Sequence, residues 1–189
     1  MTPDTNPSRI SLRGHPQQAR EPQVRRLPPA ERVADIPEHE LDTTIQEWMA
    51  LVEHDEELTC IPLSFEARTG HLPDLIADLV FRLRLPPTAK ADVSISARQH
   101  GDLRRKQGYT AAMVVEESRI LQVSIFNTLQ KNLTRVDFSN VLLDVITIAV
   151  EVDSQLKQAM LSYDTLFQTM RGRQDRALNA KAFASGQQR

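Results

Sequence analysis

His100 and Arg104 are the two residues whose types and spacing most readily suggest chemistry in this 189-residue sequence. They lie four positions apart, so on a helix both side chains project from the same face. Glu116 and Glu117 follow a tight connection at Gly108, which would allow one of these acids to meet Arg104 across a helix pair. Three roles fit such a group: a polar network that braces the connection, a small-ligand pocket, or a histidine that carries haem or a phosphoryl group.

Asp153 is the second candidate, because it is the one acid in an otherwise apolar heptad pattern. A carboxylate buried among apolar side chains is costly unless it is paired, so we expect a partner from another helix, such as Arg104, His100 or Arg119. The contact would either fix the register of the helices or form part of a sensing pocket; a solvent-facing seam at this point would need no partner. The pattern comprises Leu142, Ile146, Ala149, Asp153, Leu156, Met160, Tyr163, Phe167 and Met170.

Other kinds of site find little support. Haem is disfavoured at His100, because a glycine, an acid and basic residues follow it instead of a large apolar surface. A phosphotransfer role would require His100 to be exposed beside a basic residue, which Arg104 supplies. The sequence has no Gly-rich phosphate loop, no nucleophile-elbow motif and no metalloprotease motif, and the lone Cys60 excludes a multi-cysteine site. We therefore expect no enzymatic activity, no cofactor and no metal ion.

The distribution of helix breakers indicates which elements must position these residues. All eleven prolines lie between Pro3 and Pro87, and residues 109–171 contain neither proline nor glycine. A β-sandwich or a βαβ fold needs turn signals about every 8–15 residues, so the second half must be mostly long helix. The sequence predicts an all-α bundle of four to five helices with a long C-terminal helix.

Local signals predict where the helices begin and end. Pro37 and Pro73 suit the first turn of a helix, where the missing amide of proline is not needed. Thr110 is a good N-cap, and Thr134 with Asp137 is typical of a capping box after a break in the long apolar segment. Gly101 inside a helix indicates either a close approach to another backbone or a bend. The predicted helices cover about 37–53, 73–85, 89–107 and 110–131, and a last helix follows a break at 132–139 and ends near 170.

Composition divides the chain into three parts. Residues 1–36 are expected to be a disordered Pro/Arg-rich tail, 37–170 a helical domain, and 171–189 a basic flexible tail. The net charge of −2 hides positive ends and an acidic centre, but aromatic residues make up only 5%, which disfavours a nucleic-acid interface. Without a signal peptide or an apolar run of about 20 residues, the protein is expected to be soluble and cytoplasmic.

Four short motifs occur in an order that matches a known family. They are ARQHGDLR at 97–104, QGY at 107–109, VEESRIL at 115–121, and the segment 152–163 from a Val-Asp pair to a tyrosine. Together they resemble the N-terminal input domain of RsbRD-type RsbT co-antagonists, over roughly residues 45–167. That resemblance implies a bacterial stress-response module that precedes a STAS domain or a histidine-kinase core. Related input domains are globin-like without haem, so globin-like packing is an expectation by analogy.

The resulting prediction is a non-catalytic sensory input domain that acts by helix repacking. Its polar network would comprise His100, Arg104, Glu117, Arg119 and Asp153. Expected partners are a kinase, a STAS protein or a response regulator, or a second copy through the long last helix. No output domain follows within the sequence, so a stand-alone module or part of a split or truncated protein is expected. The alternatives are a histidine phosphotransfer protein that uses His100 and a structural helical adaptor.

Overall fold

The computed structural model describes residues 31–86, 88–89, 93–139 and 141–186, the last of these by its backbone alone beyond residue 165. All regular structure within these residues is helical, which confirms the all-α class. The one extended contact there is an isolated parallel bridge between Glu31 and Val136. None of the described helices combines the length and the apolar character needed to cross a bilayer.

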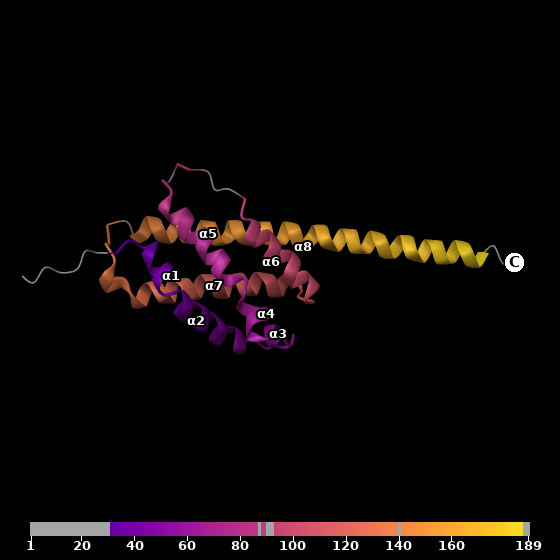
Figure 1. Cartoon of the computed structure of the whole chain (residues 1–189), viewed down its shortest axis with the longest axis horizontal. Helices are drawn as coiled ribbons and strands as arrows, with labels where there is room; N and C mark the ends of the chain where they lie inside the picture. The colour runs from indigo at the N-terminus through magenta and orange to yellow at the C-terminus, as the bar shows by residue number, and fades with distance from the viewer. Residues whose placement is uncertain (1–30, 87, 90–92, 140, 187–189) are drawn as a thin grey trace, which may run out of the picture.

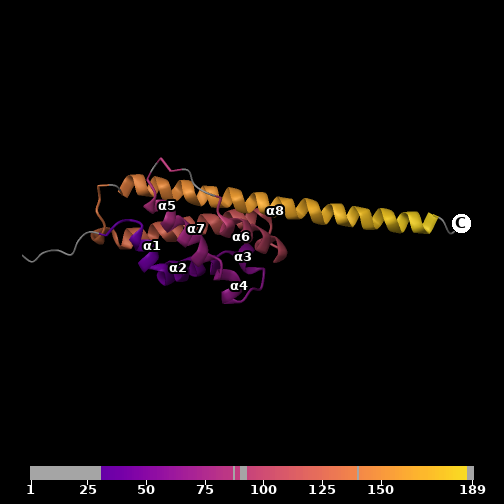
Figure 2. The ribbon, with the colours of Figure 1, turned by 45° about the horizontal axis from the view of Figure 1, so that its top comes forward.

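The helices form a body from which the last helix projects. Helix α8 lies along one side of the body against α5, α6 and α7, and it continues well past them toward the C-terminus (Figure 1). The same projection is visible after rotation (Figure 2). The helices are α1 (Asp35–His39), α2 (Leu41–Glu53), α3 (Glu56–Thr59), α4 (Phe65–Thr69), α5 (Leu72–Arg84), α6 (Ile95–Lys106), α7 (Ala111–Lys131), a 3-10 turn (Leu133–Arg135) and α8 (Val141–Gly186).

One apolar core joins these helices. Its largest members come from different elements, with Trp48 on α2, Leu79 on α5, Ile125 on α7 and Ile148 on α8, all almost fully buried. Burying a side chain of this size contributes about 1.5–3 kcal/mol each. The core therefore fixes the mutual position of α2, α5, α7 and α8 around the site described below.

Several predicted helix boundaries are confirmed. The Thr110 hydroxyl accepts a hydrogen bond from Met113 N at 3.2 Å and caps α7. Pro73 lies in the first turn of α5, and the break expected at 132–139 lies between the end of α7 at Lys131 and the start of α8 at Val141. The capping box from Thr134 to Asp137 is wrong, because Thr134 lies inside the 3-10 turn. The carboxylate of Asp137 accepts a hydrogen bond from Ser139 N at 2.9 Å instead.

The predicted domain limits need correction at both ends. Residues 31–36 belong to the body, since Val33 and Ile36 are buried in the core and Glu31 pairs with the segment after α7. A turn at Glu40 also divides the first predicted helix into α1 and α2. At the other end, α8 continues to Gly186 instead of stopping near residue 170. Residues 171–186 are rich in Ala and Arg, which favour helix, and their positive charge does not interrupt it.

Gly101 is a point of close backbone approach between α6 and α8. A Cβ atom at this position would lie 2.0 Å from the carbonyl oxygen of Ala159. Only glycine allows this distance, so close approach, and not a bend, is the correct interpretation of Gly101.

The buried face of α8 differs from the predicted heptad seam. It runs through Ile148, Val152, Gln155, Ala159 and Tyr163. This face is offset by about one position, because α8 meets α5, α6 and α7 on that side. Asp153 consequently lies on the exposed side of the helix, and Leu142 of the predicted seam is 73% exposed.

Candidate functional site

A buried ion pair between α6 and α7 is the centre of the site. Arg104 Nε donates to Glu117 Oε2 at 2.7 Å, and the two side chains are 0% and 2% exposed. The remaining guanidinium nitrogens donate to the carbonyl oxygens of Ala67 at 3.2 Å and Arg68 at 2.6 Å. Gly108 makes the short connection possible with a φ of 87°. The predicted cross-helix pair between Arg104 and a glutamate of the next helix is therefore confirmed for Glu117.

A second buried arginine extends this network toward α3. Arg68 donates to the Tyr109 hydroxyl at 2.9 Å and to the Leu58 carbonyl oxygen at 3.1 Å. The Arg104 guanidinium also lies over the Tyr109 ring, 4.7 Å from its centroid. Burial raises the pKa of Tyr109, so its hydroxyl stays protonated. Arg68 is thus held by neutral oxygens, and Arg104 by neutral oxygens, the Tyr109 ring and Glu117.

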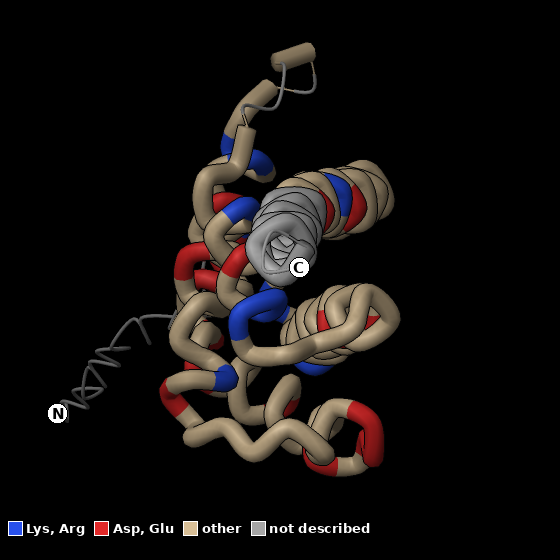
Figure 3. Tube along the Cα trace, turned by 90° about the vertical axis from the view of Figure 1, so that its right-hand side faces the viewer, with Lys and Arg blue, Asp and Glu red and all other residues tan. Residues whose placement is uncertain are grey.

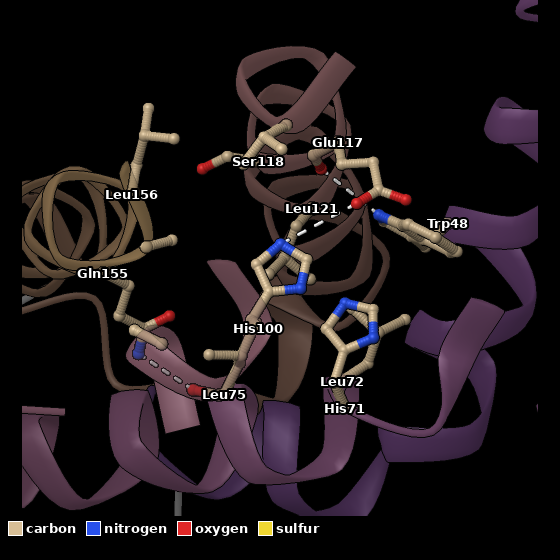
Figure 4. Close-up of a pocket in the computed structure, with 13 residues that line it drawn as sticks. Trp48, His71, Leu72, Leu75, His100, Glu117, Ser118, Leu121, Gln155 and Leu156 are labelled. Carbon is tan, nitrogen blue, oxygen red and sulfur yellow. Dashed lines mark hydrogen bonds and ion pairs between the residues drawn. The ribbon is translucent and has the colours of Figure 1, made fainter. Parts of the chain in front are cut away.

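Two histidines lie beside the ion pair. His100, 7% exposed, places Nε2 3.7 Å from Glu117 Oε2 and stacks on His71 with ring centroids 4.2 Å apart and planes 17° apart. Trp48 meets the His71 ring edge-on and donates from its indole nitrogen to the Glu117 carbonyl oxygen at 3.3 Å. Figure 4 shows the two imidazoles side by side below the Glu117 carboxylate.

These side chains border a small cavity that α8 helps to close. It offers about 20 Å³ to the centre of a water-sized sphere, enough for one water molecule. Trp48, Leu72, Leu75 and Leu121 supply apolar walls, and Gln155, Leu156 and Ala159 of α8 form another side. A porphyrin does not fit this volume, so the arrangement gives no support to haem at His100.

Burial keeps both histidines neutral. It lowers the pKa of His100 to about 3, and the nearby Arg104 acts in the same direction. Burial likewise lowers the pKa of His71 well below 6.5, with His100 and Arg104 adding to the effect. Burial raises the pKa of Glu117, while Arg104 opposes that shift. His71 Nδ1, His100 Nδ1 and Glu117 Oε1 are buried without a hydrogen-bond partner, which is costly for polar atoms.

The structure assembles three of the five predicted network residues and leaves out two. Glu117 joins the other two, with His100 Nε2 at 3.7 Å and Arg104 Nε at 2.7 Å from its Oε2. Arg119, with its side chain 60% exposed, pairs with Glu116 one turn away on the outer face of α7. Asp153 is exposed on α8, so the expectation that it needs a buried partner is wrong.

Four residues of the site were not expected from the sequence. His71 occupies the turn before Pro73, a position typical of a loop or a cap, yet its side chain makes no capping bond. The other three are Arg68, Trp48 and Gln155. They reach the site through hydrogen bonds between segments that are distant in sequence. No spacing along the chain identifies such contacts, because they depend on how α2, α5 and α8 pack.

The burial of His100 contradicts the phosphotransfer interpretation. A phosphoryl acceptor must be reached by a partner's active site, whereas this imidazole is enclosed between α5, α6 and α7.

Comparisons with known proteins add no family to this picture. A scan of family models found no match to the chain, and searches of curated proteins and of solved structures found none either.

Proposed function

We propose that this chain is a non-catalytic bacterial signalling input domain whose buried cluster controls how α8 packs. One observation carries the proposal: the cavity beside His100 and Glu117 is closed by Gln155, Leu156 and Ala159 of α8, the helix that projects from the body. A change in the cluster would alter the packing contacts of α8 directly, and α8 would transmit this change to a partner.

Polar contacts tie α8 to the elements around the cluster. Gln155 donates from Nε2 to the Leu75 carbonyl oxygen at 3.0 Å, in the core beside the cavity. Tyr163 donates to the Tyr109 carbonyl oxygen at 2.8 Å and accepts from Arg105 at 2.8 Å. These contacts link α8 with α5, α6 and the Gly108 connection. They give α8 defined bonds that a repacked state would exchange for others.

The motif resemblance supports the same class of protein and suggests its partners. Under the proposal, the partner is a kinase, a STAS protein or a response regulator in a bacterial stress pathway. Globin-like packing remains part of the proposal by the same analogy. The exposed thiol of Cys60 suits a reducing, cytoplasmic environment.

A second copy of the chain is the other proposed partner of α8. Leu142, Ile146 and Val150 follow one another at four-residue steps and form an exposed apolar stripe along the first turns of α8. Two copies that align this stripe would bury it, and their projecting segments would run side by side. Input and output would then be coupled within a dimer.

A structural adaptor is the competing function, and the polar cluster argues against it. An adaptor needs only a stable body, and apolar packing usually supplies that at least as well as a buried ion pair. Under the proposal, the buried polar cluster and the cavity beside it allow two packings of similar free energy, as a conformational switch requires.

The decisive experiment alters the cluster without touching the surface. Glu117→Gln removes the buried charge, and Glu116→Gln, on the next residue and on the outer face of α7, is the matched control. In the native host, we expect Glu117→Gln to change the stress response and the recovery of a kinase, STAS protein or response regulator, and Glu116→Gln to leave both unchanged. Equal behaviour of the two variants would support the adaptor.

A further inference from the structure

We propose that His71, His100 and Glu117 form a binding site for one divalent transition-metal ion, with zinc as the ion that their chemistry suits best. One ligand atom from each residue lies within 4.8 Å of the other two. The residues come from the turn before α5, from α6 and from α7, so the fold brings together groups that are far apart in sequence. The site is independent of the signalling proposal, and either can fail alone.

The donor atoms are those that zinc prefers. Two imidazoles and one carboxylate, with water at the fourth position, are a common zinc ligand set. Imidazole binds a metal in its neutral form, the form in which burial holds both histidines. Glu117 Oε1 and both Nδ1 atoms are buried without a partner, so donor atoms are available at the cluster.

The cavity supplies the room for the remaining ligand. About 20 Å³ beside the two rings accommodates a single water molecule, which would complete a four-coordinate ion. The apolar side chains of Leu72, Leu75 and Leu121 enclose this space, and Ser118 and Gln155 offer polar atoms at its edge. Figure 4 shows both imidazoles facing this space from below Glu117.

Binding requires the stacked rings to separate. A metal ion lies in the plane of each imidazole that binds it, whereas these planes are nearly parallel. Zinc ligands about 2.0 Å from the ion in tetrahedral geometry are roughly 3.3 Å apart, so the donor atoms must also approach one another. One histidine therefore turns on binding, and the start of α5 moves relative to α6.

Arg104 determines which carboxylate oxygen is available. It holds Glu117 Oε2, and its other nitrogens bond to the carbonyl oxygens of Ala67 and Arg68. Oε2 is also the oxygen that faces His100, 3.7 Å from its Nε2, so the carboxylate must turn to bring the unpartnered Oε1 to the metal while the guanidinium keeps Oε2. The nearby positive charge makes the site weaker than an otherwise identical one without an arginine.

Zinc titration of the full chain, stripped of metal by a chelator, tests this assignment. Calorimetry is expected to show one equivalent of zinc, and cobalt substitution is expected to give a visible absorption band of tetrahedral type. His100→Gln and Glu117→Gln should each weaken binding by about 100-fold or more, because loss of an outer-shell partner alone already costs about 10–100-fold. The controls His54→Gln and Glu116→Gln, both outside the cluster, should bind as the unaltered chain does.

A second measurement covers variants that fail to fold. X-ray absorption at the zinc edge of the unaltered chain should show two imidazoles and oxygen ligands. Absence of binding, equal binding by all four variants, or a sulfur ligand from Cys60 would overturn the proposal.

Discussion

Arg104 and Glu117 show what a single buried pair does for this fold. Each side chain bonds to the other, and Arg104 also bonds to backbone carbonyl oxygens. Of the polar side-chain atoms of the pair, Glu117 Oε1 is buried without a hydrogen-bond partner. The pair is not the cheapest way to fill the space between α6 and α7, because desolvation offsets much of the attraction. Removing one partner is nevertheless severe, since the other charge is left buried alone.

Arg104→Met therefore leaves Glu117 without its counter-ion. We expect the free energy of unfolding to fall by about 3–5 kcal/mol. Urea denaturation followed by circular dichroism measures the change. Arg98→Met, an exposed position on the same helix, should stay within about 0.5 kcal/mol of the unaltered chain. Similar losses of unfolding free energy in Arg104→Met and Arg98→Met would show that the buried ion pair matters no more than an exposed arginine.

The two histidines predict how stability depends on pH. The lowered pKa of His100, about 3 against 6.5 unfolded, means that the unfolded chain binds more protons between these values. The stability that comes from the buried neutral histidine is therefore fully present above about pH 6.5. Below that pH the free energy of unfolding declines by about 1.4 kcal/mol per pH unit for each such histidine. The raised pKa of Glu117 acts in the opposite direction, so comparison with a variant is needed.

Urea denaturation of the unaltered chain and of His100→Gln between pH 7.5 and 5 isolates the histidine contribution. The unaltered chain should lose more stability on acidification than the variant, by about 1–2 kcal/mol at pH 5 to 5.5. His54→Gln, an exposed position at the end of α2, serves as the control. Parallel pH curves for the unaltered chain and His100→Gln would contradict the burial of a neutral imidazole.

Sequence reasoning finds part of this site for a physical reason. His100 and Arg104 share a helix face, and Glu117 follows a short connection, so local geometry alone brings them together. His71 and Trp48 enter through packing between distant helices, which no local pattern records. Asp153 was misplaced because an acid in an apolar pattern does not reveal which side of the helix is covered.

At the level of elements, the contact of α6 with α8 depends on Gly101. Its lack of a side chain lets the Ala159 carbonyl group approach the α6 backbone. The helix ends around it were predictable because caps and breakers, such as Thr110 and Pro73, act locally. The burial pattern of α8 was not predictable, because its packing against α5, α6 and α7 decides which face is covered.

Gly101→Ala inserts a methyl group into this contact. We expect destabilisation by about 1–3 kcal/mol as α6 and α8 are pushed apart. On an exposed helix position the same substitution would stabilise by up to about 1 kcal/mol, so the sign of the effect is diagnostic. Chemical denaturation measures it, with Gln99→Ala on the exposed face of α6 as control. A stabilised Gly101→Ala variant would show that the helices are not in close contact.

At the scale of the whole molecule, α8 connects the enclosed site to the surroundings. It closes the cavity, presents an apolar stripe near its start and projects beyond the body (Figure 1). An end-on view shows acidic and basic residues interspersed over the visible body, without the single cationic face that a nucleic-acid partner would favour (Figure 3). The shape favours contacts through α8.

The proposed dimer predicts a measurable change in mass. Sedimentation of the full chain should give a dimer, and Ile146→Glu should shift it to monomer because a charge would enter the apolar stripe. Gln122→Glu, on the partly exposed face of α7, is the control and should remain dimeric. A monomeric unaltered chain, or a dimer that withstands Ile146→Glu, would exclude this interface.

The most direct test of the central claim measures whether the buried cluster sets the position of α8. Spin labels on the native, exposed Cys60 and on Leu161→Cys of α8 give one distance across the molecule. Pulsed electron resonance would compare this distance in the parent, with Glu117→Gln, and with Glu116→Gln as control. We predict a shifted or broadened distance distribution for Glu117→Gln alone. Superimposable distributions in all three folded proteins would contradict the account.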